Sequence, residues 1–102
     1  MEENEKKQYL LNFGRRVRFY REKLGMTQKE LGIKAGYVDG TNPSASISKI
    51  ETGQVDVTQT KCADLARALE IEPYELVIGE QTARLIKYAN LIMKGGQNVD
   101  NK

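Results

Sequence analysis

The sequence predicts an all-α protein, and three observations support this fold class. Apolar residues recur at three- and four-residue spacing in several stretches, which is the pattern of amphipathic helices. Thr, Asn or Pro stands where many of these stretches begin and glycine where most of them end, as expected of helix caps. No stretch shows the alternating pattern of a strand. A chain of 102 residues is expected to form one domain with a modest core.

The first helix is expected from about residue 8 to residue 24, after a flexible polar tail at residues 1–7. Five apolar residues at helical spacing form the side that faces the core. They are Leu10, Phe13, Val17, Tyr20 and Leu24. Gly25 stands where this helix ends, and Phe19 lies off the apolar stripe as a half-exposed packing residue.

The central stretch of the chain predicts two short helices joined by a turn. Thr27 and Glu30 have the spacing of a capping box, and Gly36 is placed to stop the helix that follows them. Asn42 is a candidate cap for the second helix, with Pro43 at its first helical position. The turn between the two helices is therefore expected to end at Asn42.

The second of these helices has two distinct faces. Ile47 and Ile50 share one face, and the opposite face carries small, polar and basic side chains. These are Ala45, Ser48, Lys49 and Thr52. A helix with such a face fits the major groove of DNA, so the pair is typical of a helix-turn-helix.

Two more helices are expected behind this pair. Thr58 is a candidate cap for a helix that runs to about residue 70 and turns small and apolar residues inward. These are Cys62, Leu65, Ala66 and Leu69. Pro73 opens a short helix that Gly79 closes. Cys62 is expected to be a small core residue and not a reactive thiol.

The C-terminal segment, residues 80–94, is expected to add a helix from about Thr82, before a flexible tail at residues 95–102. Four of its apolar residues share one side: Leu85, Tyr88, Ala89 and Ile92. A free helix of this length is marginal in water, so this side must be covered. We consider two coverings, the chain's own domain and a second copy in a two-fold dimer, and we favour the dimer.

Composition excludes several classes of chemistry. There is no histidine and only one cysteine, so neither a histidine-based triad nor a Cys/His metal site can form. No phosphate-binding glycine motif is present. We therefore expect no enzyme, no cofactor and no metal. No apolar run is long enough to span a membrane and the charged N-terminus is unlike a signal peptide, so a cytoplasmic protein is expected.

Charge is distributed unevenly along the chain. Residues 15–49 hold eight Lys or Arg against three Asp or Glu, whereas residues 50–80 hold two against seven. A chain that presents one basic face to phosphates would have such a distribution. Clustering of charges on solvated faces is common, so this observation supports DNA binding only weakly.

Between residues 13 and 78 the sequence resembles the phage-repressor/Cro-like (Xre-type) helix-turn-helix family. The matching segments, in order, are FGRRVRFYREKLGMTQKEL, KAG, SISKIETG and DLARALEIEPYEL. The resemblance implies a five-helix lambda-repressor-like DNA-binding domain at residues 8–79, with the C-terminal helix as an addition. It also implies double-stranded DNA as a partner, in a prokaryotic or phage setting.

The resemblance assigns roles to individual residues. Base reading falls to Ser44, Ala45 and Lys49 of the second central helix. Contact with the DNA backbone falls to Gln28, Ser46, Ser48, Thr52, Arg15 and Arg16. Arg21 and Glu51 match an ion pair that holds the first helix to the third. Their charges are therefore expected to be structural, because a partly buried arginine is usually paired.

Two features depart from the family pattern. The connection between the two central helices is about five residues longer than usual, which the weak dependence of loop entropy on length tolerates. Its residues Tyr37, Asp39, Thr41 and Asn42 either form a plain solvated loop or contact phosphates. The second departure is Gly32, where a small alanine is usual.

Taken together, these patterns predict a sequence-specific regulator of transcription, most simply a repressor that acts as a homodimer on a near-palindromic operator. The alternative is a protein-interaction module on the same fold, such as an antitoxin or an adaptor. The basic half and the small polar face of the recognition helix favour DNA, because an adaptor would be expected to expose a large apolar patch there.

Overall fold

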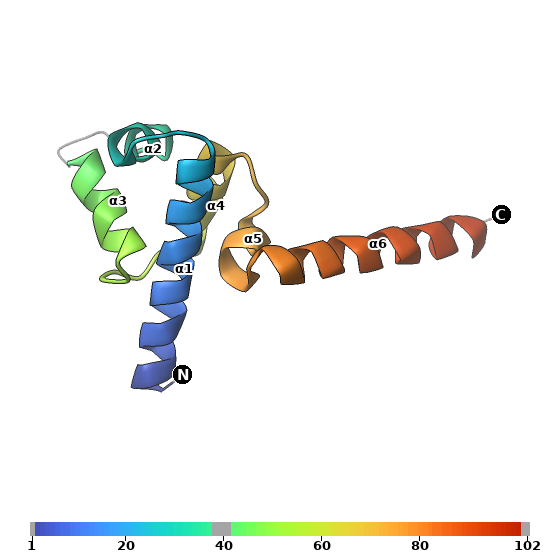
Figure 1. Cartoon of the computed structure of the whole chain (residues 1–102). Helices are drawn as coiled ribbons and strands as arrows, with labels where there is room; N and C mark the ends of the chain where they lie inside the picture. The colour runs from blue at the N-terminus through green and yellow to red at the C-terminus, as the bar shows by residue number, and fades with distance from the viewer. Residues whose placement is uncertain (1, 38–41, 101–102) are drawn as a thin grey trace.

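The computed structural model describes residues 2–37 and 42–100, with side chains for 2–37, 42–79, 82 and 84–94. In this part of the chain there are six helices and no strand (Figure 1). The helices are α1 (Glu3–Lys23), α2 (Gln28–Lys34), α3 (Pro43–Glu51), α4 (Gln59–Leu69), α5 (Pro73–Ile78) and α6 (Glu80–Asp100). The predicted all-α fold is confirmed. Asp39 and Thr41, two of the residues named above in the long connection, lie outside the described residues.

The predicted caps of the inner helices are all present. The Thr27 hydroxyl accepts from the Glu30 backbone N–H at 3.0 Å while the Glu30 carboxylate accepts from the Thr27 N–H at 2.8 Å. These hydrogen bonds lower the pKa of Glu30. The Asn42 side chain accepts from Ala45 N–H, and Thr58 accepts from Lys61 N–H. Each bond satisfies a donor that a helix start leaves without an intrahelical partner.

The two outer helix boundaries differ from the prediction. α1 begins at Glu3, so residues 3–7 are helical and not the expected flexible tail. Glu3 and Glu5 lie in its first turn, where carboxylates interact favourably with the helix dipole. α6 runs through Gly95-Gly96 to Asp100, beyond the expected end. Glycine lowers helix propensity by about 1 kcal/mol per residue but does not forbid a helix as proline does.

Helices α1 to α5 enclose one hydrophobic core. The fully buried large side chains are Val17, Leu31, Ile47, Leu65, Leu69 and Leu76. Most predicted inward residues lie in this core, including Cys62, whose thiol pKa is raised by burial as in an inert structural cysteine. Leu24 is an exception at 42% exposed, because α1 ends at Lys23 and turns Leu24 out of the stripe.

A close approach between helices in this core involves Gly14 of α1 and the end of α3. A Cβ added at Gly14 would meet the backbone carbonyl groups of Ile50 and Glu51, the oxygen of Glu51 at 2.6 Å. The two backbones can lie this close only because residue 14 has no side chain. Gly32 of α2 has the same role against Pro43 of α3, whose carbonyl oxygen a Cβ would meet at 2.6 Å.

We expect Gly14→Ala to lower the free energy of unfolding by about 1–3 kcal/mol, the cost of overpacking a close contact. At an exposed helical position the same change would stabilise the protein by about 0.5–1 kcal/mol. The sign of the change in unfolding free energy therefore distinguishes a close contact at Gly14 from an exposed position. Chemical denaturation of both proteins measures the difference. Arg15→Ala, at the exposed neighbouring position, is the control and should change stability little. A stabilising Gly14→Ala would contradict the close contact.

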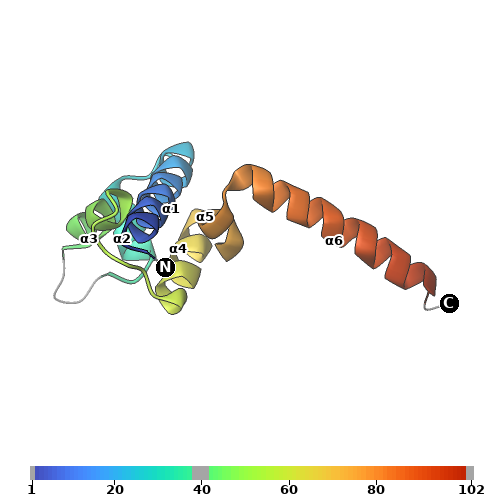
Figure 2. The same cartoon turned by 90° about the horizontal axis from the view of Figure 1, so that it is seen from below.

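Helix α6 leaves the domain instead of folding back over it (Figures 1 and 2). It follows α5 after a single residue, Gly79, whose φ of 87° is accessible mainly to glycine. Six large apolar side chains along it are 40–69% exposed: Leu85, Ile86, Tyr88, Leu91, Ile92 and Met93. Of the two coverings considered from the sequence, the chain's own domain is therefore not the one adopted here. No described helix is both long and apolar enough to cross a bilayer.

Candidate nucleic-acid interface

Helix α3 is held rigidly at the surface of the domain. Its buried face consists of Ile47, Ile50 and Glu51, which lie against α1 and α2. Asn42 caps its start, and Pro43 occupies the first helical position as predicted. Because both its beginning and its buried face are fixed, the directions of its outward side chains are fixed as well.

The outward face of α3 is built from small and polar residues and one lysine. Ala45, Lys49 and Thr52 are exposed, whereas the three serines at positions 44, 46 and 48 are half-buried at its flanks. Small residues let the helix approach a groove closely, and the lysine can donate to base or phosphate oxygens. The face that the sequence predicted is therefore the one that the fold exposes.

One side chain of this face, that of Thr52, is hydrogen-bonded within the protein itself. The Thr52 hydroxyl donates to the Ser48 carbonyl oxygen at 2.8 Å and accepts from the Gln54 side chain at 2.7 Å. Gln54, which sequence reasoning did not single out, therefore extends the polar face beyond the end of α3. Its side chain is exposed and carries a further amide N–H and a carbonyl oxygen. In the sequence, only the position of Gln54 shortly after the recognition helix could have indicated that it extends the polar face.

A buried ion pair connects the end of α3 to α1. Arg21 Nε lies 2.6 Å from Glu51 Oε2, and Arg21 Nη2 donates to Glu51 Oε1 at 3.1 Å. The side chains are only 11% and 4% exposed. The hydrogen bond to Glu51 is the main cause that raises the pKa of Arg21. Arg21 also donates to the Met26 carbonyl oxygen at 2.8 Å, which fixes the chain before α2.

Gln28 joins this ion pair to the recognition helix. Its amide nitrogen donates to Glu51 Oε1 at 3.1 Å, and its amide oxygen accepts from the Ser44 hydroxyl at 3.5 Å. Gln28 thus lies at the seam between α2 and α3, half-buried, where it orients Ser44. Its predicted phosphate contact stays a prediction, and in the structure the amide is turned toward α3.

Arg16 makes a contact within the domain that the sequence did not predict, and its predicted contact with the DNA backbone stays a prediction. Its guanidinium donates to the carbonyl oxygens of Leu76 at 3.1 Å and Val77 at 2.8 Å, at the end of α5. Arg16 is two residues from Gly14, so it lies on nearly the opposite side of α1 from α3. It therefore stabilises the C-terminal end of α5 and does not share a face with Lys49. This partner is 60 residues away in sequence, which is why no local pattern revealed it.

The start of the long turn is anchored to α4 by a lysine that the sequence did not mark. Lys61 Nζ donates to the Ala35 carbonyl oxygen at 3.0 Å and lies 4.3 Å from the centre of the Tyr37 ring. Asp64 lies 3.5 Å from the same ammonium group. Burial, and then the charge of Asp64, raise the pKa of Tyr37. Tyr37, considered above as a phosphate contact, is instead packed against the core.

Comparisons with known proteins agree with this geometry. A model of the helix-turn-helix (HTH_3) family matches residues 17–76, which include α2, α3 and α4. A similar solved structure is that of the restriction-modification controller protein C.AhdI from Aeromonas hydrophila, at 36% identity and a TM-score of 0.58. The match covers 66% of this chain and 94% of that chain. No curated protein matches the chain.

The chain belongs to the helix-turn-helix (HTH_3) family, since the family match extends over more than half of its length. It is a DNA-binding regulator of transcription of the Cro/Xre type. Helix α6 lies outside the matched residues, so the family match assigns no role to it.

Proposed function

We propose that the protein is a repressor that binds a near-palindromic operator as a homodimer. The observation that carries this proposal is the exposed face of α3, where Ala45, Lys49 and Thr52 stand on a helix fixed by buried contacts. This role needs no catalytic step, cofactor or metal. A cytoplasmic location belongs to the same proposal, because a prokaryotic operator lies there.

The residues of the interface divide into two groups by what they would contact. Lys49 would read guanine acceptors, Ala45 would pack against a thymine methyl group, and Ser44 would contact base edges near the start of α3. The DNA backbone would be met by the flanking residues Gln28, Ser46, Ser48, Thr52 and Arg15. These backbone contacts would provide the part of the affinity that depends on salt and not on sequence.

Dimerisation follows from the small size of the reading surface. One recognition helix contacts too few base pairs for high specificity, and two copies about 34 Å apart on a palindrome overcome this limit. Helix α6 offers the means, because its side with Leu85, Tyr88 and Ile92 is exposed in the described part of the helix. Ala89, four residues after Leu85, adjoins this side at its edge, where a small residue lets another helix approach.

Binding to a pool of random duplexes, followed by sequencing of the retained molecules, tests this proposal. We expect a motif with two-fold symmetry and half-sites about one helical turn apart. Affinity should fall steeply as salt rises. An antitoxin or adaptor that has lost DNA binding would retain no duplex above background, and an asymmetric single motif would contradict the homodimer.

We expect Lys49→Ala to weaken binding to the operator by about 1–3 kcal/mol and to relax the preference at one base pair of each half-site. The reason is the outward direction of Lys49, opposite the buried Ile47 and Ile50. Titration against all single-base-pair variants of the operator measures the effect. Arg67→Ala removes one positive charge from an exposed position of α4, a helix that packs against α1, α2 and α5, and is the control. Uniform weakening across all variants would assign Lys49 to a phosphate.

A further inference from the structure

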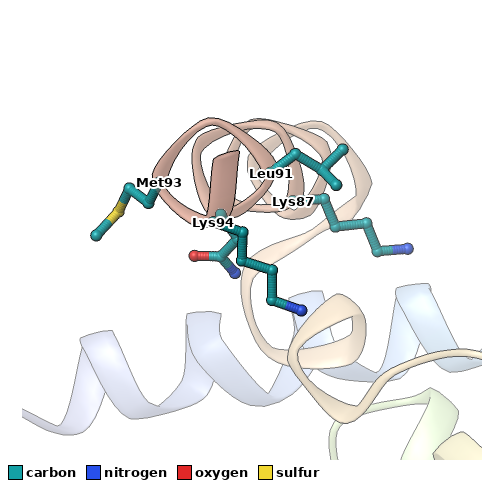
Figure 3. A pocket seen from close by; sticks show the side chains of 5 residues that line it. Lys87, Leu91, Met93 and Lys94 are labelled. Atoms are coloured by element: carbon teal, nitrogen blue, oxygen red, sulfur yellow. The ribbon is translucent and has the colours of Figure 1, made fainter. Parts of the chain in front are cut away.

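The exposed apolar surface of α6 is one broad arc, which we divide into two adjoining strips that meet where Leu85 and Ala89 lie four residues apart. The first strip is formed by Leu85, Tyr88, Leu91 and Ile92, and the second by Ile86, Ala89 and Met93, as helical periodicity requires. Figure 3 shows Leu91 and Met93 pointing to opposite sides of the helix, with Lys87 and Lys94 on the side between them. Lys87, Asn90 and Lys94 form the narrow polar stripe that separates the two strips on this side.

An apolar arc that covers more than half of the helix circumference needs two neighbours. A two-stranded coiled coil covers only the narrow seam of positions a and d, so pairing of α6 with one other helix would leave the second strip in water. If covered completely, the six large apolar side chains would bury on the order of 700 Å² in each copy, close to the roughly 800 Å² per partner of a standard stable interface. The apolar surface is therefore large enough for a stable dimer.

The surface of the domain is hollowed beside α5, and the chain's own α6 does not fill this space. Two adjoining hollows of about 400 and 340 Å³ share Tyr20 and follow the second half of α1 beside α5. We call them the α1–α5 trough. Its apolar lining includes Phe19, 49% exposed, and Leu24, 42% exposed, with Ile71 partly buried between α4 and α5.

The chain's own α6 is directed away from the trough by its connection. Gly79 lines one of the hollows and is the only residue between α5 and α6, so α6 starts at the edge of the trough and runs outward (Figures 1 and 2). At about 1.5 Å per residue, its 21 residues reach about 30 Å from that edge. This distance is enough to cross a second domain of the same size.

Charge also suits a second copy. All charged residues of α6 whose side chains are described, Arg84, Lys87 and Lys94, are basic. Glu70 and Glu75 line the trough beside Leu24. Within one chain Lys87 already lies 3.9 Å from Glu75, at 51% and 13% side-chain exposure. Arg15 and Arg16 line the hollow beside Gly79, and Lys23 lines the other hollow together with the two glutamates. Lys87 and Lys94 of one copy would therefore be placed at the Leu24 end of the partner's trough, where the acidic groups lie.

We propose that the homodimer is formed by exchange of α6 arms: each α6 packs its first strip against the partner's α6 and its second strip in the partner's α1–α5 trough. This inference rests on the proposed homodimer and specifies its interface. It gives both strips a neighbour and covers Phe19 and Leu24 in the same step.

Disulfide mapping on the full-length protein tests this arrangement. Cys62→Ala removes the only native cysteine, and Tyr88→Cys in that background should form a disulfide with its own copy. For the trough, Leu24→Cys protein is mixed with an equal amount of Ile86→Cys, Ala89→Cys or Met93→Cys protein. We expect a crosslinked mixed dimer for at least one of these three. Lys7→Cys, an exposed position in the first part of α1 that lines neither hollow, is the control and should crosslink with Leu24→Cys at least fivefold less.

The outcomes separate this inference from the proposed function. If Tyr88→Cys crosslinks but none of the three mixtures does, α6 pairs only with α6, so arm exchange is wrong and the homodimer remains. If sedimentation of the unmodified protein shows a monomer at all concentrations and on operator DNA, arm exchange and the homodimer both fail. Binding of a single half-site would then still test DNA recognition.

Discussion

Loss of either Arg21 or Glu51 is expected to destabilise the domain by about 3–5 kcal/mol, because each removal leaves the other charge buried without its partner. The side chains are 11% and 4% exposed, so water cannot replace the lost ion pair. Chemical denaturation of Arg21→Met and Glu51→Gln measures the two effects. These replacements keep most of the side-chain volume, so the loss reports on charge and hydrogen bonding rather than on a cavity.

A double-mutant cycle shows whether the two residues act as a pair. The double variant Arg21→Met, Glu51→Gln should be less destabilised than the sum of the single variants, because it leaves no uncompensated charge. Arg18 and Glu22 are the control, since they form an ion pair at 3.1 Å with side chains 64% and 56% exposed. An exposed pair of this kind couples by less than about 1 kcal/mol. Strict additivity at Arg21 and Glu51 would refute the coupling.

The same pair links stability to recognition. Glu51 is the last residue of α3 and also accepts from Gln28, which in turn accepts from Ser44 at the start of α3. Removing Glu51 therefore removes the ion pair at the end of α3 and one of the two hydrogen bonds that place Gln28 beside Ser44. We infer that these buried polar contacts orient the DNA-reading face, while the apolar core provides most of the stability.

Features encoded by neighbouring residues could be predicted from the sequence. The capping residues Thr27, Asn42 and Thr58 act on backbone groups three residues away, so their pattern is complete within a short window. The buried face of α3 follows from helical spacing for the same reason. The family resemblance added the pairing of Arg21 with Glu51, which are 30 residues apart and have no local signature.

Features that depend on distant backbone could not be predicted. Arg16 donates to carbonyl groups of α5, and Lys61 anchors the residues before the long turn, and both contacts form only when the helices pack. The need for Gly14 is likewise set by the approach of α3, not by its neighbours in sequence. The sequence predicts the start of α1 and the end of α6 at other residues than the structure shows, namely Glu3 and the stretch after Gly95-Gly96. At such ends few tertiary contacts fix the helix boundary, so local propensity is a poor guide to it.

Truncation after Gly79 is expected to weaken binding to the full operator by roughly 10²–10⁴-fold, because the second half-site would no longer be held at high effective concentration. The remaining chain should fold, since the five helices α1 to α5 enclose their own core and the match to C.AhdI covers 94% of that protein. Sedimentation should show a monomer, and a thermal transition should confirm that it is folded.

Two comparisons make this last test specific to α6. A duplex with one half-site should bind the truncated and the full-length protein with nearly equal affinity, because α3 and its supports are unchanged. A chain that ends at Lys94 keeps both apolar strips, from Leu85 to Met93, and should bind the full operator almost as tightly as the intact protein. If the chain ending at Gly79 still dimerises and binds the full operator as tightly as the intact protein, the dimer interface lies within α1 to α5. The exposed strips of α6 would then serve a different partner.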